Sequence, residues 1–198
     1  CLDVCPAGAI QSVGDIVSVD PGICGGCGFC GSVCPSGAIQ TDYPSLEIIL
    51  NTLSDLINDF KRAGGKNPVL MLSDKSYGNE MIGLISRHGN GLPANVIPYE
   101  MHSVGRVGHD ILVSAIALGF NKIFILLDPK NSDEYSFLPK QVELANSLLS
   151  GVAKNNNNSI SIIDDNDPEK VELKIYESEG YTKIKPAPFI ALGAPRGI

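Results

Sequence analysis

A run of four closely spaced cysteines constrains this chain more than any other feature of its sequence. Cys24, Cys27, Cys30 and Cys34 are followed by Pro35, which gives the pattern C-x2-C-x2-C-x3-C-P. Three thiolates with two residues between neighbours can wrap around one face of a cubane iron–sulfur cluster, and the intervening glycines permit the tight turns. A zinc site usually takes two separated C-x2-C pairs. The pattern therefore favours an iron–sulfur cluster over zinc.

The first eleven residues repeat part of this motif. Residues 1–11 and 30–40 share two cysteines, the proline after the second cysteine, and the sequence Gly-Ala-Ile-Gln, all at one offset. Cys1 therefore corresponds to the third cysteine of a first motif and Cys5 to its fourth. The first two cysteines of that motif would precede residue 1, and the chain does not begin with Met. We expect this chain to be a fragment of a longer protein.

Residues 1–40 resemble a bacterial-type 2[4Fe–4S] ferredoxin module whose first motif is truncated. In that family the fourth cysteine of each motif ligates the other cluster. The resemblance implies that a complete cluster II is held by Cys5, Cys24, Cys27 and Cys30. It also implies that Cys1 and Cys34 hold cluster I, with the remaining ligands upstream. In this fragment those last two cysteines could instead be plain buried thiols.

Charge is unevenly distributed along the chain. The net charge is −7 at pH 7, and residues 1–43 contain four aspartates but no lysine or arginine. An acidic electron-transfer module would be steered to a basic docking patch on a partner, and nucleic-acid phosphates would repel it. No apolar run approaches the roughly 20 residues of a membrane span. All six cysteines lie in cluster spacing within the first 34 residues, which favours a reducing compartment, the cytoplasm.

The cysteine-rich part is expected to fold around its cofactor. Residues 10–20 alternate in polarity around Gly14-Asp15, which predicts a β-hairpin with its turn at that pair. The region has few apolar residues, so we expect the clusters to act as its core. Six apolar side chains are expected to pack against them: Ile10, Ile16, Val17, Ile23, Phe29 and Ile39.

Residues 44–65 are predicted to form a connecting helix. Pro44 suits its first turn and Gly64-Gly65 suits its end. Six apolar residues recur at helical spacing: Leu46, Ile49, Leu50, Leu53, Ile57 and Phe60. This stripe predicts that the helix packs on the following domain.

Strands and helices then alternate over residues 66–178. We expect strands at 68–73, 95–99, 122–127 and 159–163, and helices at 78–88, 104–118, 139–152 and 167–177. The strands are nearly continuous apolar runs, which is typical of a parallel sheet covered on both faces. Pro98 predicts an edge or a strand end. The expected fold class is α/β: a small α+β dicluster ferredoxin module at 1–43, then a Rossmann-like or flavodoxin-like sheet of about four strands. Residues 179–198 are expected to be a linker.

The α/β region resembles that of the methyl-viologen-reducing hydrogenase delta-subunit family, and more closely the middle of long bacterial proteins with several ferredoxin motifs. The residues that carry the resemblance are 95–98, 104–108, 115–120 and 122–127. The delta-subunit family has further cysteines for an additional iron–sulfur site, whereas no cysteine follows Cys34 here. We therefore expect no cluster in residues 66–178.

Electron transfer through [4Fe–4S] clusters, within a larger redox protein, is the function that the sequence favours. No G-x-G-x-x-G or P-loop occurs in the α/β region at 66–178, and no catalytic arrangement can be argued from the residues. The Gly-Arg-Val-Gly at 105–108 could hold an anion at a helix start, although a plain turn is the simpler interpretation. One alternative is a redox enzyme segment whose α/β domain binds a flavin or small substrate fed by the clusters. Another is a cluster that only stabilises the fold.

Overall fold

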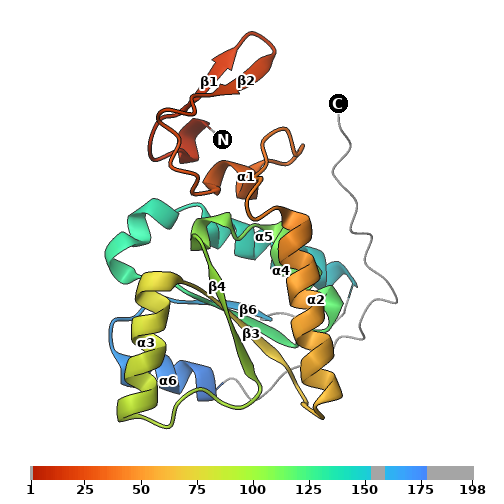
Figure 1. Ribbon diagram of the computed structural model, residues 1–198, viewed down its shortest axis with the longest axis vertical. Helices are drawn as coiled ribbons and strands as arrows, with labels where there is room; N and C mark the ends of the chain where they lie inside the picture. Colours follow the sequence, from red (N-terminus) through yellow and green to blue (C-terminus); the bar gives the residue numbers. More distant parts are fainter. Residues whose placement is uncertain (1, 153–158, 178–198) are drawn as a thin grey trace.

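A four-stranded parallel sheet organises the larger part of the protein in the computed structural model, which describes residues 2–152 and 159–177 (Figure 1). Its strands are β3 (Val69–Asp74), β4 (Val96–Met101), β5 (Lys122–Leu126) and β6 (Ile160–Ile163), in the spatial order β4-β3-β5-β6. The α/β fold class and the sheet of four strands are thereby confirmed. The linker expected at 179–198 lies outside the described residues.

Helices cover both faces of this sheet. One face carries α2 (Leu46–Arg62), α4 (His109–Leu118) and α5 (Leu138–Val152), and the other carries α3 (Lys75–His88) and α6 (Pro168–Tyr176). Leu70 and Leu72 point to the first layer, while Val69 and Met71 point to the second. Burial on both faces explains why the strands are apolar throughout. Among the described residues, no helix has the length and apolar character needed to cross a bilayer.

The edge position predicted from Pro98 is confirmed. Strand β4 pairs with β3 alone, with Pro98 opposite Met71. An edge strand has one side without a hydrogen-bonded neighbour, so it tolerates a residue that lacks the N–H donor. Strand β5 lies in the interior of the sheet, between β3 and β6.

Three helix starts differ from the predictions. Helix α2 begins at Leu46, because the Ser45 side chain accepts a hydrogen bond from Ile48 N (3.3 Å); Pro44 therefore precedes the helix. Helix α3 begins at Lys75, three residues earlier than expected, because the Asp74 carboxylate caps it. The helix expected over 104–118 is divided into the 3-10 helix η2 (Val104–Arg106) and α4.

Two further details were not predicted. A 3-10 helix, η3 (Pro129–Tyr135), follows β5, and Asp128 caps its first turn. Leu148 of α5 is 47% exposed, whereas Ala145 and Leu149 of the same helix are buried.

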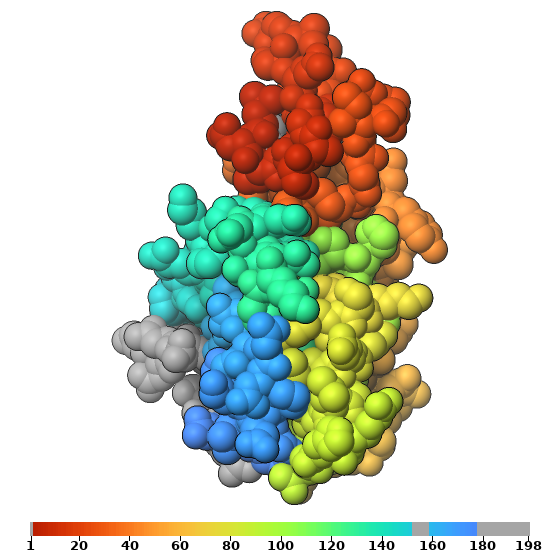
Figure 2. All heavy atoms as spheres, turned by 90° about the vertical axis from the view of Figure 1, so that its left-hand side faces the viewer, coloured from red at the N-terminus to blue at the C-terminus, as the bar shows by residue number. Residues whose placement is uncertain are grey.

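The cysteine-bearing segment projects from one end of this α/β body (Figures 1 and 2). It contains η1 (Leu2–Val4), the strands β1 (Ile10–Val13) and β2 (Ile16–Val19), and helix α1 (Phe29–Val33). The antiparallel pairing of β1 with β2 around Gly14-Asp15 confirms the predicted hairpin. Of the six apolar side chains expected to be covered, Ile10 and Phe29 are buried, whereas the exposed ones are Ile16, Val17 and Ile23.

Replacing the Asp74 cap should destabilise the α/β body. The Asp74 carboxylate accepts hydrogen bonds from Tyr77 N (2.8 Å) and Gly78 N (3.4 Å). Asp74→Ala leaves these donors unpaired and should lower the free energy of unfolding by about 1 kcal/mol in urea denaturation. Asp74→Asn keeps a capping oxygen, so its free energy of unfolding should fall much less. Equal losses in both variants would show that the cap does not set this helix start.

Candidate iron–sulfur site

The cysteines of the described chain lie on the loops and short helices of the projecting segment. Cys5 follows η1, Cys24 and Cys27 lie in the loop before α1, Cys30 lies in α1, and Cys34 ends it. All five are free thiols. Cys1 lies outside the described residues. Helix η1 contacts α1, which brings the chain next to Cys5 alongside the helix that carries Cys30.

The three thiols of the C-x2-C-x2-C loop interact with one another. Burial raises the pKa of the Cys30 thiol, and the neighbouring Cys27 and Cys24 raise it further, while the backbone N–H of Gly31 opposes the shift. Like-charged thiolates that share a site are stabilised when a cation binds between them. Within residues 2–152 and 159–177, no three His, Cys, Asp or Glu side chains are gathered closely enough to hold a single metal ion.

Two other cysteine sulfurs accept hydrogen bonds. Ala9 N donates to Cys5 Sγ over 3.3 Å. Burial raises the pKa of Cys34, but hydrogen bonds from the backbone of Ile39, Ser36 and Ala38 and from the Ser36 hydroxyl outweigh it and lower that pKa to about 7. Such donors stabilise the thiolate, which is the form that ligates iron. The donor set therefore fits an iron–sulfur cofactor.

One aromatic side chain of α1, Phe29, packs on the α/β body. The Phe29 ring lies 5.3 Å from Tyr135 and 5.0 Å from Phe137, measured between ring centroids. The ring also covers Gly105 so closely that a Cβ there would overlap it. We call Gly105, Tyr135 and Phe137 the seat of α1. Phe29 was expected to pack against the clusters, but these contacts are with the α/β body.

The seat lies at the carboxyl edge of the parallel sheet. The 3-10 helix η2, which contains Gly105, follows β4, and η3, which contains Tyr135, follows β5. Ligands of open α/β sheets bind at this edge. The cysteine loop is therefore packed where other α/β proteins present their binding loops.

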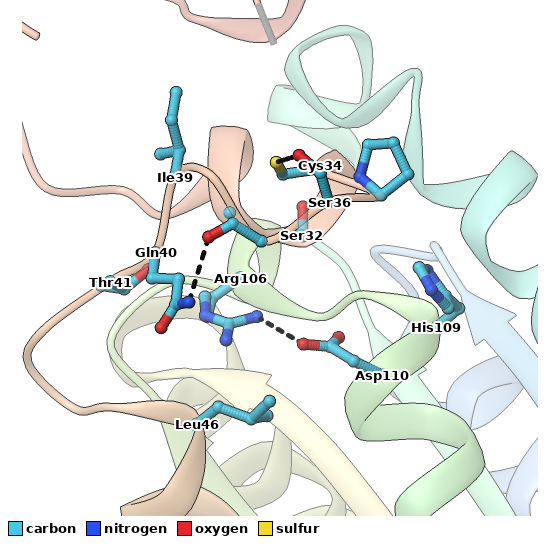
Figure 3. A pocket seen from close by; sticks show the side chains of 13 residues that line it. Ser32, Cys34, Ser36, Ile39, Gln40, Thr41, Leu46, Arg106, His109 and Asp110 are labelled. Atoms are coloured by element: carbon cyan, nitrogen blue, oxygen red, sulfur yellow. Dashed lines mark hydrogen bonds and ion pairs between the residues drawn. The ribbon is translucent and has the colours of Figure 1, made fainter. Parts of the chain in front are cut away.

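Arg106 and Asp110 lie below Ser32 and Cys34 (Figure 3). The sequence pointed to Arg106 only as part of the possible anion site at 105–108, and it did not point to Asp110. The Arg106 side chain packs against Gly28, whose φ of 80° is left-handed. Its Nη1 donates to Asp110 Oδ2 over 3.3 Å. Both residues, with Cys34 and Ser36, line a cavity of about 240 Å³. Residues 105–108 form the end of η2 and the approach to α4, and the burial of Arg106 has no local sequence signal.

A second cavity, of about 490 Å³, lies at the carboxyl ends of the strands. Tyr77 and Lys130 line it together with Asp128. The Tyr77 hydroxyl donates to the carbonyl oxygen of Asp165. Burial, together with the nearby carboxylates, of which Asp128 has the largest effect, raises the pKa of Tyr77 to about 12. This lining is polar and acidic.

Two comparisons with known proteins concern the cysteine-bearing segment. Residues 1–43 match the family model of the LdpA Fe-S cluster-binding domain. A stretch of 40 residues is 46% identical to hydrogenase-4 component A of Escherichia coli (strain K12). That stretch is 20% of this chain and 20% of that protein, so the chain spans about a fifth of this curated relative.

These matches support an iron–sulfur-binding, ferredoxin-like module at the start of the chain. They do not concern a flavin or a substrate site, so the enzyme alternative has no support from them. The family model ends at residue 43, and the resemblance of the α/β region to the delta-subunit family stays a prediction.

A methyl group on Gly105 should unseat α1. The Cβ of Gly105→Ala would overlap the Phe29 ring, so overpacking should lower the free energy of unfolding by about 1–3 kcal/mol. Gly83→Ala in α3 is the matched control, because no atom lies within 4 Å of its added Cβ and alanine favours helix. Urea denaturation should show a loss for the first variant and none for the second. If Gly83→Ala lowers the free energy of unfolding as much as Gly105→Ala does, the packing of Phe29 on Gly105 is not the cause of the loss.

Proposed function

We propose that this chain transfers single electrons through [4Fe–4S] clusters as part of a larger redox protein. The observation that carries the proposal is a cysteine set in ferredoxin spacing whose sulfurs accept N–H hydrogen bonds. A [4Fe–4S] cluster supplies a centre that accepts and releases one electron at a time. The free thiols suit a reducing compartment, and we assign the protein to the cytoplasm.

We assign the ligands by the crossover of the ferredoxin family. Cluster II takes Cys5, Cys24, Cys27 and Cys30, and a second cluster takes Cys1 and Cys34. The contact between η1 and α1 supports the long-range partner in the first set, because η1 immediately precedes Cys5. The hydrogen bond from Ala9 N to Cys5 Sγ would hold that sulfur in place.

The α/β body positions the cluster module in this proposal. We divide the chain into the module at 1–43, the connecting helix at 44–65 and the α/β domain at 66–178. The seat fixes α1 through Phe29, so the spacing between Cys30 and the α/β domain is set by side-chain packing. A rigid spacing suits electron transfer, because the donor and acceptor must approach in a defined geometry.

The outer end of the module is the surface that we assign to the redox partner. The β1–β2 hairpin exposes 54% of Val13 and 66% of Ile16, and Asp15 lies in its turn. A contiguous apolar surface flanked by acidic side chains suits a partner with an apolar centre and basic residues around it. Such a partner would carry the basic docking patch that the acidic charge of residues 1–43 predicts.

Substitution of single cysteines tests the ligand assignment. Cys5→Ser should remove most of the iron bound by the cluster of Cys24, Cys27 and Cys30, although Cys5 is distant in sequence. Cys34→Ser is the matched control, because the crossover leaves that cluster untouched. Iron content and the electron paramagnetic resonance (EPR) signal of reconstituted protein measure both. The opposite result, loss in Cys34→Ser and none in Cys5→Ser, would show ligation within one motif.

The same reconstituted protein tests the function itself. Dithionite should reduce the cluster by one electron and produce an EPR signal. If the cluster forms but cannot be reduced, the electron-transfer function is wrong, and the cluster only stabilises the fold.

Removal of acidic side chains from the module should slow its reaction with a basic electron acceptor. With a basic c-type cytochrome as the probe, the reduction rate should fall as salt is added, because salt screens the attraction. Asp3→Asn with Asp15→Asn should lower the rate several-fold at low salt, since both are exposed. Asp55→Asn, an exposed carboxylate on α2, should leave it unchanged. If the double variant and Asp55→Asn change the reduction rate equally, the partner does not dock on the outer end of the module.

A further inference from the structure

Arg106 differs from every other charged residue of residues 2–152 and 159–177 in being buried, with 6% of its surface exposed. It belongs to η2, at the carboxyl edge of the sheet, and its side chain lies between Gln40 and Asp110, below Cys34 (Figure 3). A buried guanidinium has lost most of its hydration, which is costly unless its donors are paired. Its surroundings therefore decide what this charge does.

The aliphatic stem of Arg106 touches the cysteine loop directly. A Cβ built on Gly28 would lie 2.9 Å from Arg106 Cδ and 3.1 Å from its Cβ. Gly28 follows Cys27 and stands two positions before Cys30. The arginine is thus packed against the backbone that links two of the three loop thiols.

The positive charge is only partly compensated. Its one ion pair within the described residues is to Asp110, at 3.3 Å, and the Asp110 side chain is 29% exposed against 8% for Arg106. Arg106 Nε is buried and has no hydrogen-bond partner among the described residues. Water screens the carboxylate more than the guanidinium, so a net positive potential remains beneath the loop.

We propose that Arg106 raises the reduction potential of the cluster held by the loop of Cys24, Cys27 and Cys30. The proposal rests on the electron-transfer function above. Reduction adds one negative charge, which a nearby cation stabilises, and burial keeps salt and water from screening the attraction. Asp110 moderates the effect, because its negative charge opposes that of Arg106. The α/β domain thereby contributes a residue that tunes the electron carrier.

Redox titration of the full chain, reconstituted with iron and sulfide and followed by EPR, tests the proposal through two opposite charge changes. Arg106→Met should make reduction at least tenfold less favourable, a fall of 59 mV or more for a one-electron couple. Asp110→Asn leaves Arg106 uncompensated and should move the potential upward. Arg106→Lys keeps the charge, so its reduction potential should lie between those of the other two variants.

A charge effect must be separated from a structural one. Arg62→Met is the matched control, because it removes an exposed arginine whose side chain is 79% accessible, and its potential should equal that of the wild type. Circular dichroism of each variant checks that it folds. If Arg106→Met fails to fold, Asp110→Asn still decides, since only an electrostatic role predicts an upward shift.

Two results would overturn the proposal, and they differ from failure of the proposed function. Unchanged potentials in Arg106→Met and Asp110→Asn, or shifts of the same sign in both, would make Arg106 a purely structural contact. A wild-type cluster that cannot be reduced at all would reject the electron-transfer function first, and the tuning role with it.

Discussion

The parallel direction of all four strands decides where the cysteine module can sit. Because the strands run the same way, the segments that follow β3, β4 and β5 all emerge at one edge of the sheet. Those segments include η2 and η3, which contribute Gly105 and Tyr135 to the seat of α1. The apolar strands thus do more than build a core, since their shared direction assembles a binding surface from residues distant in sequence.

The site combines two kinds of electrostatic support for negative charge. Close to the sulfurs, backbone N–H groups such as that of Ile39 lower the pKa of the Cys34 thiol and so stabilise its thiolate. Beneath the loop, a buried guanidinium supplies a longer-range potential that acts on the site as a whole. The first kind is provided by the module itself, whereas the second comes from the α/β body, so the two parts of the chain are coupled electrostatically as well as by packing.

Local signals were enough to predict much of this structure, and long-range contacts account for part of what was missed. The hairpin turn at Gly14-Asp15 and the edge strand with Pro98 are both short-range patterns, and the structure follows them. The start of α3 was missed although a local signal for it was present, because Asp74 is a strong capping residue. The break between η2 and α4 was missed, although Ser103 caps η2 and Gly108 precedes α4. The burial of Arg106, by contrast, depends on Gly28, which lies far away in the sequence.

The contact between the two parts of the chain is reciprocal in a way that restricts how the sequence can change. On each side a glycine faces a large side chain from the other: Phe29 covers Gly105, and Arg106 covers Gly28. A larger residue at either glycine would require a smaller one opposite it, because there is no free space to share. In a family that keeps this arrangement, positions 28 and 106 should vary together, as should 29 and 105. The evolutionary history of the electron carrier and of the domain beneath it would then be joined at four positions.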